Sequence, residues 1–485
     1  MSVSPPVIVW FREDLRLSDN PALAAAVAGG SPVICLYVRE TDVGNARPLG
    51  GAAKWWLNQS LISLAASLKA IGGQLILRTG EAFEVLSGLI RETAATAVFW
   101  NRRYGDAEKT SDACVKAALR EAGIEVQSFN ARLLMEPWAL KTGSGGYYRV
   151  FTPFWRALQA AYVAPPPLPA PQCMTSVSVE TEELESWALH PHAPDWSQGL
   201  ADAWTPGEDS ARTRLAEFLD GPVNAYAENR NRPDLDDSTS RLSPHLRFGE
   251  IGPAQIWRAV KAGIEARRID ERAGQVFLSE IAWREFSHVL LHFNPDLAHK
   301  NYNRAFDRMP WRSDDEALGA WQRGETGYPA VDAGMRQLWH TGWMHNRVRM
   351  IVASFLTKHL LLPWQAGETW FWDTLVDADP AINAASWQWT AGSGADAAPY
   401  FRVFNPVTQG TRFDETGAYV RRWCPELSRL PDKFLHAPFE APASIRSAAG
   451  VDLGNQYPEP IVDHSAARQR ALDAYKQTKS ERGAE

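Results

Sequence analysis

The chain of 485 residues is 45% hydrophobic and 22% charged, which is typical of a soluble protein long enough for more than one domain. No apolar run is long enough to span a bilayer, and no basic flank precedes the apolar N-terminal residues, so neither a membrane span nor a signal peptide is predicted. The net charge of −7 would by itself argue against a nucleic-acid partner. It describes the whole surface, however, and a local basic patch can coexist with it.

The first 130 residues alternate short apolar runs with helical stretches. Strands are predicted at PVIVWF, PVICLYV, QLILR, TAVFWN and EVQSF, with helices over residues 50–73 and 106–123 between them. This rhythm predicts an α/β domain with a doubly wound parallel sheet, covered by helices on both faces. No GxGxxG motif follows the first strand, so dinucleotide binding of the usual kind is not supported, although ligands of such sheets lie at the carboxyl ends of the strands.

The middle of the chain reads as a long connection, because proline in VAPPPLPAPQCMT (residues 163–175) is incompatible with a helix or a central strand. Beyond it the strand signals stop, and residues 277–293, 330–341 and 344–362 have helical periodicity. The end, residues 465–485, predicts a last helix and a frayed tail. The expected organisation is an α/β domain at 1–132, a linker at 133–204 and an all-α domain at 205–485.

The four cysteines (Cys35, Cys114, Cys173 and Cys424) are scattered and never form a CxxC motif. They predict no disulfide framework and no metal site, and they favour a reducing cytoplasm. The 21 tryptophans are the unusual feature of the composition. Large aromatic side chains in the core explain most of them, but not those that lie among Asp, Asn and Arg.

Two helical segments carry polar residues that are candidates for a site. In LSEIAWREF, Glu280 shares a helix face with Trp283 and Arg284. This is either a surface ion pair between Glu280 and Arg284 or an acid and an indole that line a pocket for a planar ligand. MHNRVRMIVA places opposite an apolar stripe a second one, polar except for its last member, that consists of Asn346, Arg349, Met350 and Ala353. This second stripe is either a half-exposed helix face or a wall beside an anionic cofactor.

Two further segments concentrate polar side chains. DSTSRLSPH places the hydroxyls of Thr239, Ser240 and Ser243 just before a helix, where they either cap it or bind phosphate. In DADPAINAASWQW (residues 377–389), a helix would put Asp379, Asn383 and Trp387 on one face. Trp389 would then point to another side of the helix.

These segments, taken in order along the whole chain, resemble the photolyase/cryptochrome family. VWFREDLRLSDNPAL resembles the opening strand and loop of the family, and TSRLSPHL, SEIAWREF, TGYPAVDAGMRQLWHTGWMHNRVRM and WQWTAGSGADAAPYFRVFNP resemble its flavin domain. The resemblance implies an antenna domain, a linker and a helical domain that holds FAD in a U shape.

The resemblance also implies roles for individual residues. FAD phosphates and ribityl are expected at Tyr226, Thr239, Ser240, Arg241, Leu242 and Ser243. An ion pair of Arg349 with Asp377, with Asp379 beside it, is expected against the isoalloxazine, and Asn383 is expected to face flavin N5. The substrate cavity is expected at Glu280, Trp283, Asn346, Arg347, Met350 and Trp389. An electron-transfer triad is expected at Trp387, Trp364 and Trp311, and contacts to the DNA backbone at Arg230, Arg347, Arg402 and Gln409.

The implied activity is light-driven repair of cyclobutane pyrimidine dimers, in which excited reduced FAD donates an electron to a dimer flipped out of UV-damaged DNA. Such a photo-lyase would bring Glu280, Asn346, Met350 and Asn383 to the reacting groups. Asn346 and Met350 stand where enzymes for (6-4) photoproducts have histidines, and Asn383 stands where plant cryptochromes have an acid. Both differences favour the cyclobutane-dimer enzyme, most similar to the bacterial class III branch.

Three questions stay open in the sequence. A blue-light photoreceptor that signals without repair is one alternative, and a single-strand-binding protein whose tryptophans only stack bases is another. The antenna is expected to be methenyltetrahydrofolate, with deazaflavin as the alternative. Glu108 in NRRYGDAEKTSD matches an acid of the folate-contacting loop, but Ala107 departs from it. A monomer is expected.

Overall fold

The computed structural model describes residues 4–397 and 401–480, so residues 398–400 of the predicted flavin motif lie outside the described part. The chain divides into two compact units. The first unit comprises residues 1–224 and 240–295, and the second comprises residues 225–239 and 296–485. The domain limits predicted after residues 132 and 204 do not coincide with the limits of these two units. The predicted domains therefore stay a prediction.

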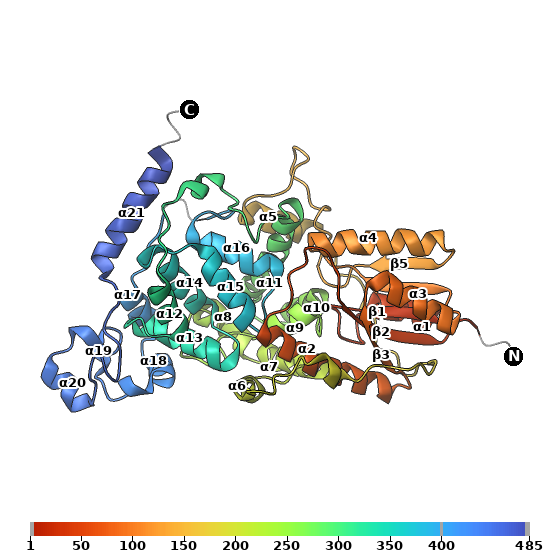
Figure 1. The fold of residues 1–485 in the computed structure, drawn as a ribbon, viewed down its shortest axis with the longest axis horizontal. Coiled ribbons are helices and arrows are strands. Elements are labelled where there is room, and N and C mark those ends of the chain that lie inside the picture. Colours follow the sequence, from red (N-terminus) through yellow and green to blue (C-terminus); the bar gives the residue numbers. More distant parts are fainter. Residues whose placement is uncertain (1–3, 398–400, 481–485) are drawn as a thin grey trace. The chain divides into compact units, whose positions relative to one another are not determined.

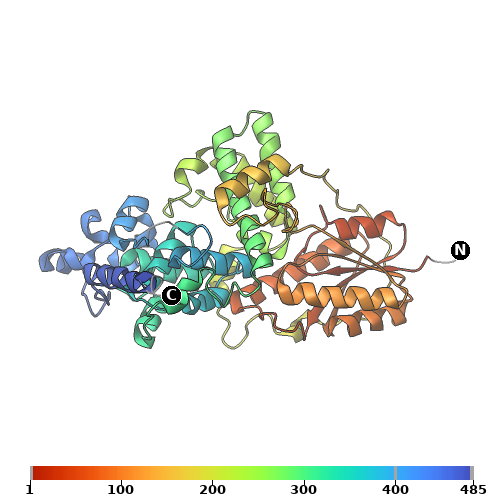
Figure 2. The same ribbon diagram turned by 90° about the horizontal axis from the view of Figure 1, so that it is seen from above.

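The first unit is built on a five-stranded parallel sheet in the order β3-β2-β1-β4-β5 (Figure 1). The strands are β1 Val7–Phe11, β2 Val33–Glu40, β3 Leu75–Gly80, β4 Ala97–Asn101 and β5 Glu125–Phe129. All five predicted strands are present, and every residue of β1 and β4 is buried because helices cover both faces of the sheet (Figure 2). The predicted doubly wound sheet is confirmed.

The helices of the first unit include two, α5 and α6, within the connection predicted at residues 133–204. The α-helices are α1 Pro21–Ala28, α2 Gly51–Ala70, α3 Ala82–Thr93, α4 Asp106–Glu121, α5 Phe151–Ala161, α6 Gln198–Ala203, α7 Glu208–Leu219, α9 Ser243–Phe248, α10 Pro253–Glu265 and α11 Glu271–Phe293. The longer of these two helices is α5. Its Phe151, Phe154 and Leu158 are buried at helical spacing, and it packs on α11.

A buried ion cluster fills the carboxyl ends of the central strands. Arg12, just after β1, donates two hydrogen bonds to Asp112 of α4 at 3.1 and 3.2 Å. Arg103, just after β4, donates to the same carboxylate at 2.7 Å and also pairs with Glu40 at the end of β2. The Arg12 guanidinium lies 4.2 Å from the ring centroid of Trp10. The edge where α/β sheets usually bind ligands therefore contains the chain's own side chains.

The second unit is helical. Its α-helices are α8 Tyr226–Asn229, α12 Asp315–Arg323, α13 Pro329–Thr341, α14 Asn346–Ser354, α15 Trp364–Thr374, α16 Pro380–Ala391, α17 Pro406–Phe413, α18 Ala418–Trp423, α19 Asp432–Leu435, α20 Ala443–Ala449 and α21 His464–Ser480. Helices α12 to α16 enclose a core that includes Trp321, Val352 and Phe371. A π-helical turn, Phe355–His359, continues α14 where the sequence predicted one uninterrupted helix. Among the described residues, no helix combines the length and apolarity needed to cross a bilayer.

Candidate active site

The start of α14 gathers basic side chains around a neutral histidine. Gly342 ends α13 with a φ of 65°, and His345 then caps α14 by accepting a hydrogen bond from Arg347 N at 3.1 Å. Burial, together with Arg347, Arg349 and Arg230 nearby, lowers the pKa of His345 to about 3. The ring is therefore neutral near pH 7. Its Nε2 is buried and finds no hydrogen-bond partner within the described part of the chain.

The two stripes predicted on α14 are present, except that Ala353, predicted on the side of Asn346, is buried. Val348, Ile351 and Val352 are buried, whereas Asn346 is exposed and Met350 is half-buried. The polar side of α14 therefore stays outside the core formed by its apolar side. This arrangement agrees with a binding wall as well as with an exposed helix face, so the role of Asn346 and Met350 stays a prediction.

Arg349 and Asp377 form the predicted ion pair. The two terminal nitrogens of Arg349 donate to the two carboxylate oxygens of Asp377 at 3.1 and 2.8 Å, and its Nε donates to Met344 O at 2.7 Å. Such a bidentate pair fixes the plane of the guanidinium. The Asp377 carboxylate is 4% exposed and the Arg349 side chain 23%, so the arginine keeps one accessible side.

Helix α16 carries the next three predicted residues. Asp379 is its N-cap and accepts from Ala381 N and Ile382 N, which explains a carboxylate at this position without any ligand. The amide nitrogen of Asn383 donates to Glu368 O at 3.0 Å and to Glu368 Oε1 at 2.8 Å. Both partners are acceptors, so they fix the orientation of the Asn383 amide. Its oxygen accepts no hydrogen bond from any described residue.

Of the three expected electron-transfer tryptophans, two are buried and one is half-buried. Trp387 is 2% exposed, and its ring lies against Gly367 of α15, where a Cβ would have no room. Trp364, one turn earlier on α15, is fully buried and donates to Asn301 Oδ1 at 2.8 Å. Trp311 is only half-buried. Trp389 is also half-buried and follows Trp387 by two positions, so the two indoles diverge as predicted.

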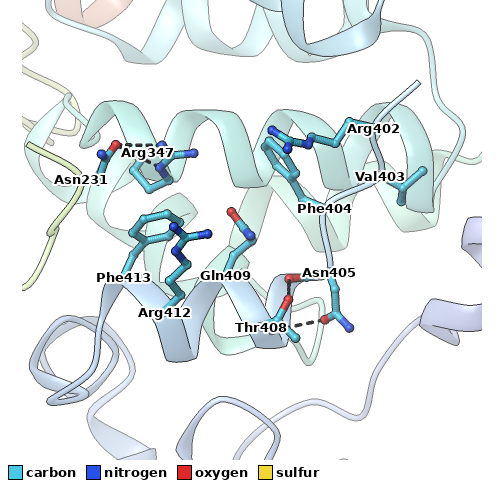
Figure 3. Close-up of a pocket in the computed structure, with 10 residues that line it drawn as sticks. All are labelled: Asn231, Arg347, Arg402, Val403, Phe404, Asn405, Thr408, Gln409, Arg412 and Phe413. Atoms are coloured by element: carbon cyan, nitrogen blue, oxygen red, sulfur yellow. Dashed lines mark hydrogen bonds between the residues drawn. The ribbon is translucent and has the colours of Figure 1, made fainter. Parts of the chain in front are cut away.

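The second unit also contains a basic cavity of about 540 Å³ (Figure 3). It is lined by Asn231, Arg347, Arg402, Val403, Phe404, Asn405, Thr408, Gln409, Arg412 and Phe413. Arg347 donates to Asn231 Oδ1 at 2.8 and 3.2 Å and lies 4.4 Å from the ring centroid of Phe413. The cavity brings together Arg347, Arg402 and Gln409, three of the four residues expected at the DNA backbone.

The arginines of this cavity have no acidic partner in the described part of the chain. Across the described residues, no carboxylate lies within ion-pair distance of Arg347, Arg402 or Arg412. Burial, followed by the charges of Arg230, Arg412 and Arg402, lowers the pKa of Arg347 to about 10. Positive charge accumulates here at an energetic cost that a polyanion would offset.

Sequence reasoning named only Arg347, Arg402 and Gln409 among the lining residues and missed the others, which are Asn231, Val403, Phe404, Asn405, Thr408, Arg412 and Phe413. A signal for Arg412 was available, because it follows Gln409 by three and Thr408 by four residues on α17 and so shares their face. No such signal exists for Asn231, which lies more than a hundred residues from its partner Arg347.

Glu280 and Trp283 lie on α11 of the first unit, and both are half-buried. Trp283 stacks on Phe151 of α5, with ring centroids 3.8 Å apart and planes 8° apart. Arg284 donates instead to Arg132 O at 2.8 Å and to Glu285 at 3.0 Å. The surface ion pair considered for Glu280 and Arg284 is therefore not formed.

The segment expected to bind phosphate contains irregular backbone before α9. The N-cap residue of α9 is Leu242, which makes no side-chain capping bond, and Arg241 has a φ of 50°. The guanidinium of Arg241 lies 4.4 Å from the ring centroid of Trp204, and Ser243 is exposed. A capping role alone does not explain this run of hydroxyls. The FAD roles of Tyr226, Thr239, Ser240, Arg241, Leu242 and Ser243 stay predictions.

The expected antenna residue, Glu108, lies in the first turn of α4. Its carboxylate folds back over Gly105, the N-cap of that helix, and occupies the place of a Cβ there. The next residue, Lys109, has its Nζ 3.4 Å from Nδ1 of His292. No set of three or more His, Cys, Asp or Glu side chains that could hold a metal occurs among the described residues.

Comparison with known proteins adds to this geometry. Family models match at two places, DNA photolyase over residues 7–172 and the FAD binding domain of DNA photolyase over residues 277–477. The chain is 54% identical over 473 residues to a deoxyribodipyrimidine photo-lyase of Agrobacterium fabrum, with 97% of both chains covered. The chain belongs to the photolyase/cryptochrome family.

Both branches of the photolyase/cryptochrome family occur among the relatives. The chain is 40% identical over 485 residues to Cryptochrome-1 of Arabidopsis thaliana, which covers 97% of this chain and 70% of that one. The crystal structure of a bacterial class III photolyase from Agrobacterium tumefaciens matches with a TM-score of 0.95 at 53% identity, over 99% of this chain and all of that one. The predicted family and fold are confirmed.

FAD is the cofactor that the matched domain implies, and the second unit fits such a group. His345 Nε2 and Trp387 Nε1 are buried donors without a partner in the described chain, and they belong to α16 and to the cap of α14, two elements that pack together. The Arg349 guanidinium and the Asn383 amide oxygen add a fixed cation and an acceptor. A heterocycle with donors and acceptors along its edge suits this set.

Proposed function

We propose that the protein repairs cyclobutane pyrimidine dimers in DNA with blue light, as a deoxyribodipyrimidine photo-lyase. The observation that carries this function is the cavity of Arg347, Arg402 and Arg412, whose charges have no acidic partner among the described residues. The 54% identity to a photo-lyase over nearly the whole chain supports it. Bound FAD, in its reduced and light-excited form, supplies the electron that splits the dimer.

The protein's contribution is position and electrostatics rather than covalent chemistry. The Arg349–Asp377 pair places one cation in a fixed plane, and Glu368 holds the Asn383 amide so that its oxygen is available as an acceptor. A neutral His345 presents an N–H without adding charge. We propose that these residues, with Asp379 at the start of α16, orient the isoalloxazine and favour its reduced form.

DNA binding follows from the basic cavity. Its arginines suit phosphate oxygens, and Phe404 and Phe413 give it apolar walls. We propose that Arg230, Arg347, Arg402 and Gln409 hold the backbone while the dimer leaves the helix, a step that costs least at a damaged pair. Binding is then expected to weaken with salt, by a factor set by the number of phosphates contacted.

The dimer itself is proposed to meet Glu280, Trp283, Asn346, Met350 and Trp389. Trp283 is held flat by its stack on Phe151, which makes it a rigid surface for a base, worth about 1–3 kcal/mol by stacking. The Glu280 carboxyl offers a hydrogen bond to a thymine carbonyl or N–H. Arg284 does not neutralise it, because that guanidinium bonds Glu285.

We further propose that Trp387, Trp364 and Trp311 carry an electron to the cofactor when it must be reduced. Two buried indoles and one half-buried indole support this route; Trp364 lies on α15, and the ring of Trp387 on α16 packs against Gly367 of α15.

The antenna is proposed to be methenyltetrahydrofolate, on the match of the loop that contains Glu108 to a folate-contacting loop. A mass spectrum of the chromophores released from the purified protein tests this, since a deazaflavin would contradict it. All four cysteines are free, which supports a reducing compartment, and we propose a cytoplasmic monomer.

A photoreceptor that signals without repair is the second candidate, favoured by the 40% identity to Cryptochrome-1. Repair of an oligonucleotide that contains one thymine dimer separates the two. With protein reduced beforehand, we expect blue light, but not darkness, to restore thymine absorbance near 260 nm. A protein that binds FAD and photoreduces but restores no absorbance would support the photoreceptor.

A further inference from the structure

Lys358 is a buried lysine for which the described residues offer no carboxylate partner. It is 4% exposed and lies in the π-helical turn after α14. Its Nζ donates to the carbonyl oxygen of Arg402 at 2.6 Å and lies 4.6 Å from the ring centroid of Phe401. Burial, and then the charge of Arg402, lowers the pKa of Lys358 to about 7. An apolar side chain would fill this space at lower cost, so stability does not explain the lysine.

The bond from Lys358 is one of several that hold residues 401–405, a segment without regular secondary structure. The Phe401 ring stacks on Tyr475 at 4.6 Å. Phe404 N donates to Ser354 Oγ at 3.3 Å, and Asn405 caps α17. Ser354 ends α14 and Lys358 lies four residues later in the π-helical turn that continues it, so this helical stretch anchors two successive parts of the segment.

The outer side of the same segment belongs to the basic cavity. Arg402 is exposed and lines that cavity with Arg347 and Arg412 (Figure 3). Its backbone carbonyl points to Lys358 while its side chain reaches the cavity, so rotation of this peptide displaces the guanidinium. The Arg402 guanidinium is also 5.8 Å from the ring centroid of Phe404, the residue that Ser354 holds. The two anchors therefore act on the two side chains at one end of the cavity.

We propose that Lys358 is a positioning residue for DNA binding, which holds the backbone of Arg402 so that its guanidinium meets a DNA phosphate. This rests on the proposed function, since it assigns Lys358 to the same DNA site. The neutral amine also donates a hydrogen bond, so the anchor persists on either side of neutral pH.

The test is a salt series of binding to a thymine-dimer oligonucleotide by the full-length, FAD-loaded Lys358→Met variant. We expect the affinity to fall about tenfold and the slope of log K against log salt to lose about 0.9, the value for one phosphate contact. Arg402→Ala should change the slope equally, and the double variant should add little to either single change. The flavin absorption spectrum and repair of already bound dimer should match those of the unchanged protein.

Lys433→Met is the matched control, because this exposed lysine also lies over a phenylalanine ring, 5.2 Å from the centroid of Phe434, but holds no part of the cavity. Its slope should be unchanged. An unchanged slope for Lys358→Met, whatever its thermal stability, would overturn the proposal. Should that variant not fold, Ser354→Ala tests the neighbouring anchor: a smaller slope loss supports the proposal and an unchanged slope contradicts it. Failure of the unchanged protein to bind dimer-containing DNA would instead refute the proposed function.

Discussion

Two groups of arginines in this protein differ in how their charges are paired. In the first unit, Asp112 and Glu40 surround Arg103, and they raise its pKa above the ordinary value although burial alone would lower it. In the second unit, Arg347 has an amide and a phenyl ring for neighbours, and its pKa is lowered to about 10. The difference teaches that the pairing of arginines, rather than their number, separates a structural cluster from a binding site.

The largest expected effect is on the paired cluster. Asp112→Ala leaves Arg12 and Arg103 without their shared carboxylate, and we expect about 3–5 kcal/mol less free energy of unfolding. Denaturant titration measures it. Asp106→Ala removes an exposed acid from the same helix and should cost less than about 0.5 kcal/mol. Equal losses of free energy of unfolding for the two variants would contradict a structural role of the paired cluster.

The same cluster predicts a dependence on pH. Burial would raise the pKa of Asp112, but Arg12 and Arg103 lower it below its ordinary value. A depressed folded-state pKa stabilises the protein above the unfolded-state value, about 3.9, and this stability is lost as pH falls through the folded-state pKa. Unfolding titrations at pH 3 to 6 should show the loss, and Asp112→Asn should remove that part of the pH dependence.

The next effect concerns the unpaired cluster. We expect Arg347→Ala to weaken binding of dimer-containing DNA by about 2 kcal/mol, roughly thirtyfold, because a charged hydrogen bond to phosphate is lost. Its stability should stay within about 0.5 kcal/mol or rise, since a costly charge is removed. Arg323→Ala, which removes an exposed arginine paired with Glu325 in the same unit, is the control and should bind normally.

A third test asks whether the second unit also carries electron transfer. Trp311→Phe should abolish most photoreduction of oxidised FAD, because the half-buried end of the route is lost, while repair by chemically reduced protein stays nearly intact. Flash photolysis and the repair assay measure the two. Loss of repair in the reduced variant would show that Trp311 acts on the substrate side instead.

The smallest expected effect is in the first unit. Glu280→Ala should lower dimer binding and the yield of repair about fivefold, the size of one hydrogen bond of about 1 kcal/mol, without loss of FAD. The flavin absorbance ratio and a binding titration check both. A variant without flavin would mean that Glu280 supports the cofactor rather than the substrate.

The sequence was a good guide where local pattern decides structure. Five apolar runs gave five strands, and the stripes on α14 and the divergence of Trp387 from Trp389 follow from helical geometry. The sequence did not predict which side chains pair when the two residues are far apart along the chain. Nothing in the segments NRRYG and HNRVRM indicates that Arg103 forms an ion pair with Glu40, whereas Arg347 donates a hydrogen bond to Asn231. Helix α5 was missed because the prolines that follow it suggested a connection throughout.

Single-turnover repair at two salt concentrations tests the central claim, that the unpaired arginines hold damaged DNA for light-driven repair. Full-length protein with reduced FAD is mixed with an oligonucleotide that contains one thymine dimer, and absorbance near 260 nm is followed under blue light. We expect recovery at low salt that falls steeply as salt rises, because phosphate contacts are lost. No recovery in the light at low salt, with FAD bound and reduced, would contradict the claim.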